Sequence, residues 1–247
     1  MDITAATFWV SLLQIIWIDL LLSGDNAVVI ALACRSLPKK QRKWGILLGA
    51  AAAVVLRILF ALLVSLLLGI PFLKVAGALL LLWIAVKLVT DDGGEAHEVA
   101  ASDSLFKAVR TIAIADAVMS LDNVVAIAAA SRGHPELFIV GLLLTIPLIV
   151  FGSQMMLAVL TRFPILIWAG AALLGWIAGE MLMGDAMVLQ ALQAHDATLV
   201  QPDAESPAGL HAAAFIRHIA SIIGAVFVVG VGWLITRKRG DGPPTPA

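Results

Sequence analysis

The sequence predicts an all-α polytopic membrane protein with seven transmembrane helices, arranged as two inverted three-helix repeats followed by a seventh helix. Three observations lead to this prediction. The 247 residues are 61% hydrophobic and only 13% charged, with a mean hydropathy of +1.01. Several apolar runs are long enough to cross a hydrocarbon core about 30 Å thick. Two separate sequence patterns also recur, in the same order, in the two halves of the chain.

Apolar length, together with the positions of proline, glycine and charged residues, divides the chain into seven expected spans. They lie at about residues 7–34, 44–69, 71–90, 106–131, 136–161, 163–184 and 213–236. Continuous apolarity, without short alternating segments, favours helices over a transmembrane β-barrel. The first run has no basic stretch before it and no small-residue cleavage site after it, so we expect a retained helix rather than a signal peptide.

Lysine and arginine residues are distributed unevenly between the loops, and this distribution predicts the orientation. Twelve of the sixteen fall on one side of the expected membrane: Arg35, Lys39, Lys40, Arg42, Lys43, Lys87, Lys107, Arg110, Arg162, Arg237, Lys238 and Arg239. Lys74, Arg132 and Arg217 fall on the other side, and Arg57 lies inside the second span. The positive-inside rule then places the N-terminus outside and the C-terminus in the cytoplasm. The membrane is expected to be a bacterial inner (plasma) membrane.

A polar pattern in the first span recurs in the fourth span, 97 residues further on. The first copy contains Asp19, Ser23, Asp25 and Asn26, and the second contains Asp116, Ser120, Asp122 and Asn123. The third and sixth spans also match, because Pro71 to Lys87 resembles Pro164 to Glu180. Each copy has an odd number of helices, so the second copy enters the membrane from the opposite side. Inverted repeats of this kind are typical of alternating-access transporters.

The repeat also gives the expected domain organisation. We expect a first three-helix repeat (1–90), a cytoplasmic acidic linker (91–105), a second three-helix repeat (106–184), an outer loop (185–212), the seventh helix (213–236) and a cytoplasmic tail (237–247). The outer loop is long enough for a short surface helix. The charged runs in the linker and the outer loop are typical of solvated segments, and we expect no metal site in either.

The four repeated aspartates are the strongest functional candidates. A carboxylate near the bilayer centre costs roughly 2.5–3.5 kcal/mol, so such residues are expected to have a function. Arg57 can neutralise one of them, and the others require protons or a bound cation. Carboxylate and amide oxygens suit Mn²⁺, Mg²⁺ or Ca²⁺, and the absence of Cys and His from the motifs argues against a zinc or copper site.

We therefore predict a site for a hard divalent cation. Its expected ligands are Asp19, Asp25, Asn26, Asp116, Asp122 and Asn123, supported by Ser23 and Ser120, with Arg57, Glu180 and Lys87 compensating charge or relaying protons. Structural alternatives stay open: the asparagines can bond neighbouring helices, Arg57 can be a structural counter-ion, and Lys87 can snorkel to the interface. Four aspartates, one arginine and a divalent ion leave one negative charge, so the site should retain about one proton and release protons when metal binds.

The two aspartates of one motif should not both contact one small ion. On a straight helix, Asp19 and Asp25 differ by about 9 Å in height and about 120° in direction, whereas metal–oxygen distances are about 2–2.6 Å. Unless the first span unwinds at Gly24, one aspartate ligates the ion and the other is an access point or proton carrier. We expect Asp25 and Asp122 to ligate, because an asparagine follows each of them.

The paired Asp-x5-Asp-Asn motifs and the two Ala-Gly-Ala-x-Leu-Leu-x-Trp-Ile-Ala helices resemble the TerC family of integral membrane proteins, and the resemblance covers all seven spans. It implies export of divalent metal, chiefly manganese, through acidic residues in the membrane. We therefore expect a secondary transporter, not an enzyme, that exports Mn²⁺ or another hard divalent cation in exchange for protons. Its expected partners are the metal ion, protons and the lipid bilayer. We expect no cofactor and no nucleic acid, and the oligomeric state stays open.

Two alternative functions remain at this stage. A passive divalent-cation channel is compatible with inverted repeats. An intramembrane aspartyl protease is compatible with paired membrane aspartates, because two such groups can share a proton as an acid/base dyad. Protease chemistry would leave the repeated asparagines and the second aspartate of each motif unexplained.

Overall fold

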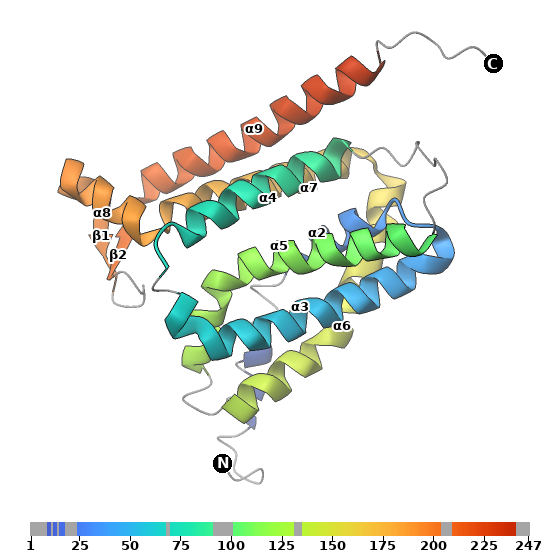
Figure 1. The fold of residues 1–247 in the computed structure, drawn as a ribbon, viewed down its shortest axis with the longest axis horizontal. Coiled ribbons are helices and arrows are strands. Elements are labelled where there is room, and N and C mark those ends of the chain that lie inside the picture. The colour runs from blue at the N-terminus through green and yellow to red at the C-terminus, as the bar shows by residue number, and fades with distance from the viewer. Residues whose placement is uncertain are drawn as a thin grey trace. The chain divides into compact units, whose positions relative to one another are not determined.

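The structure of the protein is a computed structural model, and it describes residues 9–10, 12–13, 15–17, 24–67, 70–90, 101–130, 135–203 and 209–240. For 24–25, 61–62, 64–67, 101–103, 121–130, 135–138 and 238–240 it describes the backbone only. The described elements are α2 (Gly24–Cys34), α3 (Lys39–Leu67), α4 (Leu73–Thr90), α5 (Ala101–Ala130), α6 (Pro135–Arg162), α7 (Ile165–Met183), α8 (Ala186–His195), η1 (Ala197–Leu199), β1 (Val200–Pro202), β2 (Leu210–Ala212) and α9 (Ala214–Gly240) (Figure 1).

The long helices agree with the expected spans. Judged on the described residues, five segments are long and apolar enough to cross a membrane: Lys39–Phe60, Leu73–Thr90, Ile139–Arg162, Ile165–Met183 and Ala214–Arg237. These segments correspond to the second, third, fifth, sixth and seventh expected spans. The first and fourth spans, which carry the aspartate motifs, lie partly outside the described side chains. The number of seven spans and the inverted topology therefore stay predictions, whereas a polytopic helical membrane protein is confirmed.

Proline residues mark several of the helix boundaries. Pro135 is the first residue of α6, where its fixed φ suits the first turn and its missing N–H is not needed. Pro164 separates α6 from α7, and the residue before a proline is disfavoured in helical conformation. Pro71 and Phe72 form the turn before α4, and Phe72 has a positive φ of 59°. Proline thus coincides with the ends of these long helices.

The chain divides into two compact units that do not coincide with the expected repeats. Unit 1 comprises Met1–Ile70 and Gly93–Pro164, and unit 2 comprises Pro71–Asp92 and Ile165–Ala247. Unit 1 thus contains α2, α3, α5 and α6, which belong to the first and second spans of the two copies. Unit 2 contains the third span of each copy, α4 and α7, together with α8, the hairpin and α9. Corresponding helices of the two copies are therefore found in the same unit.

In unit 1 the helices pack mainly across the two copies. Helix α3 packs along α5 and α2 packs along α6, with further contacts of α3 with α6 and of α2 with α5. The pairs α3–α5 and α6–α2 are equivalent under the repeat. Glycine allows the close approach of α3 to α5, because a Cβ on Gly49 would collide with the Ile112 side chain. This packing places the middle turns of α5 against the middle turns of α3.

In unit 2, α7 packs along α9 and against α4, which also contacts α9. Gly175 and Gly179 lie one turn apart on α7, and a Cβ on either would collide with a backbone oxygen of α9, at Gly224 and Ala220 respectively. Such small-residue pairs allow helix backbones in membranes to approach closely. The matching positions on α4 are Leu82 and Val86. Of the two copies, the second alone therefore has the pair of glycines against which α9 packs.

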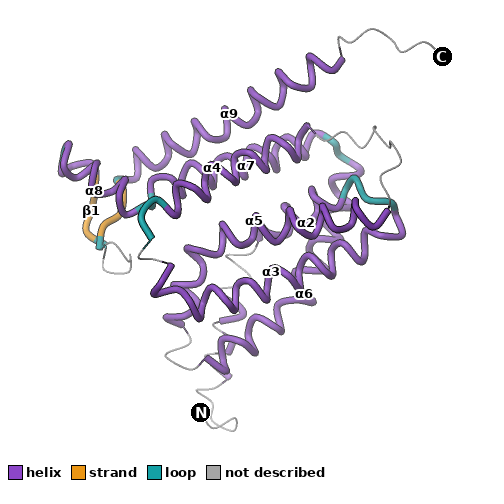
Figure 2. The backbone as a smooth tube through the Cα atoms, in the orientation of Figure 1, coloured by secondary structure: helices purple, strands orange, loops and turns teal. Residues whose placement is uncertain are grey.

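Residues 185–212, predicted to form an outer loop, contain the expected short helix and one element that was not expected. Helix α8 is capped by Asp185, whose carboxylate accepts hydrogen bonds from the backbone N–H of Met187 at 2.9 Å and of Lys74 at 3.2 Å. Strands β1 and β2 then form an antiparallel hairpin, shown in orange in Figure 2. The all-α prediction therefore holds for the long helices but not for this loop. Backbone and side-chain hydrogen bonds from Thr198 hold the pKa of Asp196 below its ordinary value.

Candidate functional site

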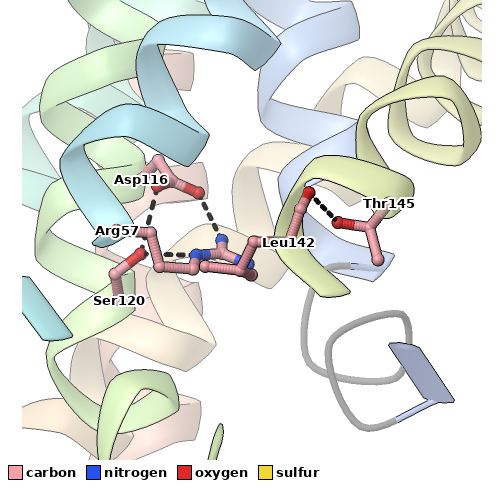
Figure 3. Close-up of polar contacts among 5 residues, drawn as sticks. All are labelled: Arg57, Asp116, Ser120, Leu142 and Thr145. Atoms are coloured by element: carbon pink, nitrogen blue, oxygen red, sulfur yellow. Dashed lines mark hydrogen bonds and ion pairs between the residues drawn. The ribbon is translucent and has the colours of Figure 1, made fainter. Parts of the chain in front are cut away.

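The polar centre of unit 1 is an ion pair between α3 and α5. The Nη2 atom of Arg57 lies 2.6 Å from Oδ1 of Asp116. Arg57 also donates a hydrogen bond from Nε to Oγ of Ser120, at 3.1 Å, and Ser120 donates from Oγ to Oδ2 of Asp116, also at 3.1 Å. Figure 3 shows the three side chains pointing toward one another. Both carboxylate oxygens of Asp116 thus have a donor, and the three residues form a closed ring.

This ring is buried in the apolar interior of the unit. Arg57 is 1% exposed, Asp116 is 3% exposed and Ser120 is fully buried. Ser120 lies one helical turn after Asp116 on α5, so the two side chains are on the same face of that helix. The sequence analysis expected Arg57 to neutralise one of the four aspartates. Among the described side chains, Asp116 is the aspartate that Arg57 contacts, and Ser120 bonds both residues. The functional roles predicted for the three residues stay predictions.

A second motif residue lies close to Asp116. A small cavity of about 10 Å³ is lined by Asn26 and Asp116 together with Val29, Ile30 and Ile112. A volume of this size has room for about one water-sized particle. Asn26 comes from the first motif, on α2, and its side chain is 3% exposed, whereas Asp116 comes from the second motif, on α5. The fold therefore brings polar residues of the two copies to one place.

The second motif lies on an uninterrupted helix. Helix α5 runs from Ala101 to Ala130 and includes Asp116, Asp122 and Asn123. On such a helix, Asp116 and Asp122 differ by about 9 Å in height and about 120° in direction. One small ion cannot contact both carboxylates from these positions. In the second copy, the structure therefore shows the continuous helix that the predicted division of roles between the two aspartates requires.

Several predicted site residues fall outside what the structure describes. Asp19 and Ser23 lie outside the described residues, and for Asp25, Asp122 and Asn123 only the backbone is described. Asp25 is in the first turn of α2. Among the described side chains there is no group of three His, Cys, Asp or Glu residues that could hold a metal ion. The complete ligand set therefore stays a prediction.

Glu180 and Lys87 both lie in unit 2. On α7, Oε1 of Glu180 lies 3.4 Å from Nε of Arg217 on α9, and the Glu180 side chain is about half exposed. On α4, Nζ of Lys87 lies 5.1 Å from the centroid of the Trp83 ring, one turn earlier. Inside unit 2, Glu180 thus interacts with Arg217 and Lys87 interacts with Trp83. The charge-compensating or proton-relay role of Glu180 and Lys87 stays a prediction.

The sequence analysis missed two buried polar residues on α6, in unit 1. Thr145 and Ser153 are both fully buried. The Thr145 hydroxyl donates a hydrogen bond to the carbonyl oxygen of Leu142 at 2.9 Å (Figure 3). Oγ of Ser153 has no hydrogen-bond partner among the described residues. The eight-residue spacing between the two, about two helical turns, was the available signal that they share one face.

Comparison with known proteins agrees with this architecture. A family model described as "Integral membrane protein TerC family" matches residues 4–240. The chain is 46% identical to the uncharacterized membrane protein YjbE of Bacillus subtilis (strain 168) over 178 residues, which are 72% of this chain and 81% of that protein. No solved structure matches this chain.

Two further membrane proteins of the same bacterium are similar to parts of the chain. YceF is 36% identical over 85 residues, 34% of this chain and 33% of that protein. YkoY is 25% identical over 196 residues, 71% of this chain and 60% of that protein. Because the family model covers nearly the whole chain and YjbE is similar over most of its length, this protein belongs to the TerC family of integral membrane proteins.

Proposed function

We propose that the protein is a secondary transporter that exports divalent metal cations, Mn²⁺ above all, from the cytoplasm in exchange for protons. One observation carries the proposal: Asn26 of the first motif and Asp116 of the second line a single buried cavity. A binding site assembled from two copies of a repeated motif is the arrangement that alternating-access transporters use. Membership of the TerC family supports the same class of activity.

The chemistry of the motif favours a hard cation. Carboxylate and amide oxygens suit Mn²⁺, Mg²⁺ and Ca²⁺, whereas thiolates and imidazoles favour zinc and copper. We assign direct ligation to Asp25 and Asp122 with their adjacent asparagines. Asp19 and Asp116 then act as the access points or carriers in each copy, because a continuous helix such as α5 separates them from the ligating position.

The buried ion pair weakens the case for an aspartyl protease. A dyad of that kind requires two carboxyl groups to share one proton. Oδ1 of Asp116 instead accepts from Arg57, and Oδ2 accepts from Ser120. Among the described side chains, Asp116 is therefore engaged by an arginine and a serine and by no second acid. No observation in unit 1 specifically favours a passive channel.

Flux measurements in proteoliposomes test the proposal. The purified protein is reconstituted into vesicles that contain a manganese-sensitive dye, and a proton gradient of either sign is imposed. We expect Mn²⁺ to accumulate above its external concentration only when the proton gradient can drive it. Asp25→Asn should abolish this uphill flux, whereas Asp196→Asn, which neutralises an exposed carboxylate in the outer loop, should not.

Each alternative outcome has a clear meaning. Movement of Mn²⁺ that only equilibrates the two sides, whatever the proton gradient, would identify a channel. Vesicles that move no divalent cation would rule out transport by this protein.

A further inference from the structure

Helices α3 and α6 are the second helices of the two repeats, and their burial patterns fix how they correspond. With an offset of 96 residues, five of the seven buried positions of α3, at 45, 46, 49, 53 and 57, correspond to buried positions of α6, at 141, 142, 145, 149 and 153, and the other two, 50 and 54, correspond to half-buried ones. An offset of 97 would instead align several buried positions with exposed ones, including Arg57 with the exposed Gln154. The counterpart of Arg57 is therefore Ser153.

At this matched position the two halves of unit 1 thus differ by one fixed charge. In the α3–α5 half, a buried guanidinium reaches the first aspartate of the second motif. In the equivalent α6–α2 half, the corresponding position carries a fully buried hydroxyl that has no hydrogen-bond partner among the described residues. Asp19 is the counterpart of Asp116 in sequence. The repeat therefore supplies a built-in cation for Asp116 and none at the matching position of the other copy.

We propose that Arg57 is a built-in competitor of the transported cation at the carrier position: its guanidinium occupies Asp116 when the ion is absent, and an ion that moves to or from the ligating aspartates displaces it from that carboxylate. This inference rests on the proposed function and specifies how the empty site is stabilised. The ion-free protein would otherwise hold a further uncompensated carboxylate in the membrane, which is costly. An arginine that substitutes for the ion lets the empty transporter keep its buried charges paired.

The geometry around Asp116 suits such an exchange. Asp116, which Arg57 contacts, also lines the small cavity of about 10 Å³ that it shares with Asn26. Among the described side chains, the guanidinium contacts Asp116 through Nη2 and Ser120 through Nε. When the carboxylate turns to an ion, the Ser120 hydroxyl can therefore still accept from Nε. Ser120 gives the displaced arginine a buried partner and limits the cost of the exchange.

Affinity measurements on purified variants test the competition. Mn²⁺ is titrated into the protein in detergent at pH 8, using wild type, Arg57→Gln, Arg57→Lys and Ser153→Ala. A competitor lowers the apparent affinity of the position that it occupies, so we expect Arg57→Gln to bind Mn²⁺ at the Asp116 position at least about fivefold more tightly than wild type. Arg57→Lys should be intermediate, because an ammonium lacks the fork that reaches both Asp116 and Ser120. Ser153→Ala should match the wild type.

A second measurement separates competition from a purely structural role. Arg57→Gln should melt at a lower temperature than wild type without metal, and saturating Mn²⁺ should raise its melting temperature more than it raises that of the wild type. Folded Arg57→Gln and Arg57→Lys proteins that bind Mn²⁺ no more tightly than wild type would overturn the inference, even if the proposed function stands. If Arg57→Gln does not fold, the affinity of Arg57→Lys for Mn²⁺ tests the inference by itself. Wild-type protein that binds no hard divalent cation would overturn both the proposed function and this inference.

Discussion

Arg57 and Asp116 form a buried ion pair between the second helix of one repeat and the first helix of the other, with Nη2 and Oδ1 2.6 Å apart. The two residues are 59 positions apart in sequence, and both are almost completely shielded from solvent. A buried pair of this kind contributes little net stability compared with apolar residues, but losing one partner leaves an uncompensated charge. Its presence in a protein of apolar helices therefore indicates a role connected with the motif aspartates.

The Ser120 hydroxyl should be important for stability because it bridges both charges. Ser120→Ala removes the acceptor for Arg57 Nε and the donor to Asp116 Oδ2, and we expect a loss of about 1–3 kcal/mol. Ser153→Ala is the matched control, since that hydroxyl is equally buried but has no hydrogen-bond partner among the described residues. Thermal or denaturant unfolding in detergent compares the two. Equal stabilities for both variants would contradict a structural role for the ring.

The close contact between α7 and α9 should tolerate no added methyl group. Gly179→Ala places a Cβ against the backbone oxygen of Ala220, so we expect overpacking to cost about 1–3 kcal/mol. Gly230→Ala, on α9, adds the same atom where no neighbour lies within 4 Å, and it should be neutral or slightly stabilising. The same unfolding measurement distinguishes them. If Gly179→Ala is as stable as Gly230→Ala, the two helices do not pack as the structure shows.

The two aspartates of each motif should differ in function. We expect Asp25→Asn and Asp122→Asn to abolish metal binding, and Asp19→Asn and Asp116→Asn to keep measurable binding while losing coupled flux. The uninterrupted helix α5 supports this division, because it separates Asp116 from Asp122 by about 9 Å along its axis. Calorimetry on the four purified variants provides the measurement. Loss of binding in all four to the same degree would indicate a single shared site.

Metal binding should release protons. Four aspartates and Arg57 leave three negative charges in an apolar setting before a divalent ion enters and one afterwards, so the metal-bound site should retain about one proton and the ion-free site should hold more. Titration of Mn²⁺ in buffers of different ionisation enthalpy gives the number of protons released. Binding that is independent of pH between about 5 and 8 would rule out proton coupling through these residues.

Most of the long helices could be predicted from the sequence, because apolar length and proline positions determine where a chain can cross a bilayer. The contact between Arg57 and Asp116 could not be predicted from the sequence. The four motif aspartates look equivalent until it is known which residues of α3 face which residues of α5. The same limit applies to Gly175 and Gly179, which suggest close packing without naming α9 as the partner. The hairpin was missed because three-residue strands carry too little alternation to be recognised.

If this protein exports manganese, as we propose, the metal content of cells depends on it. Cells with and without the gene are grown in the same medium, and their manganese, calcium, magnesium, iron and zinc are measured. We predict that manganese alone rises strongly when the protein is absent, and that wild-type protein, but not Asp122→Asn, restores the normal level. Equal changes in all five metals, or no change in manganese, would contradict the account.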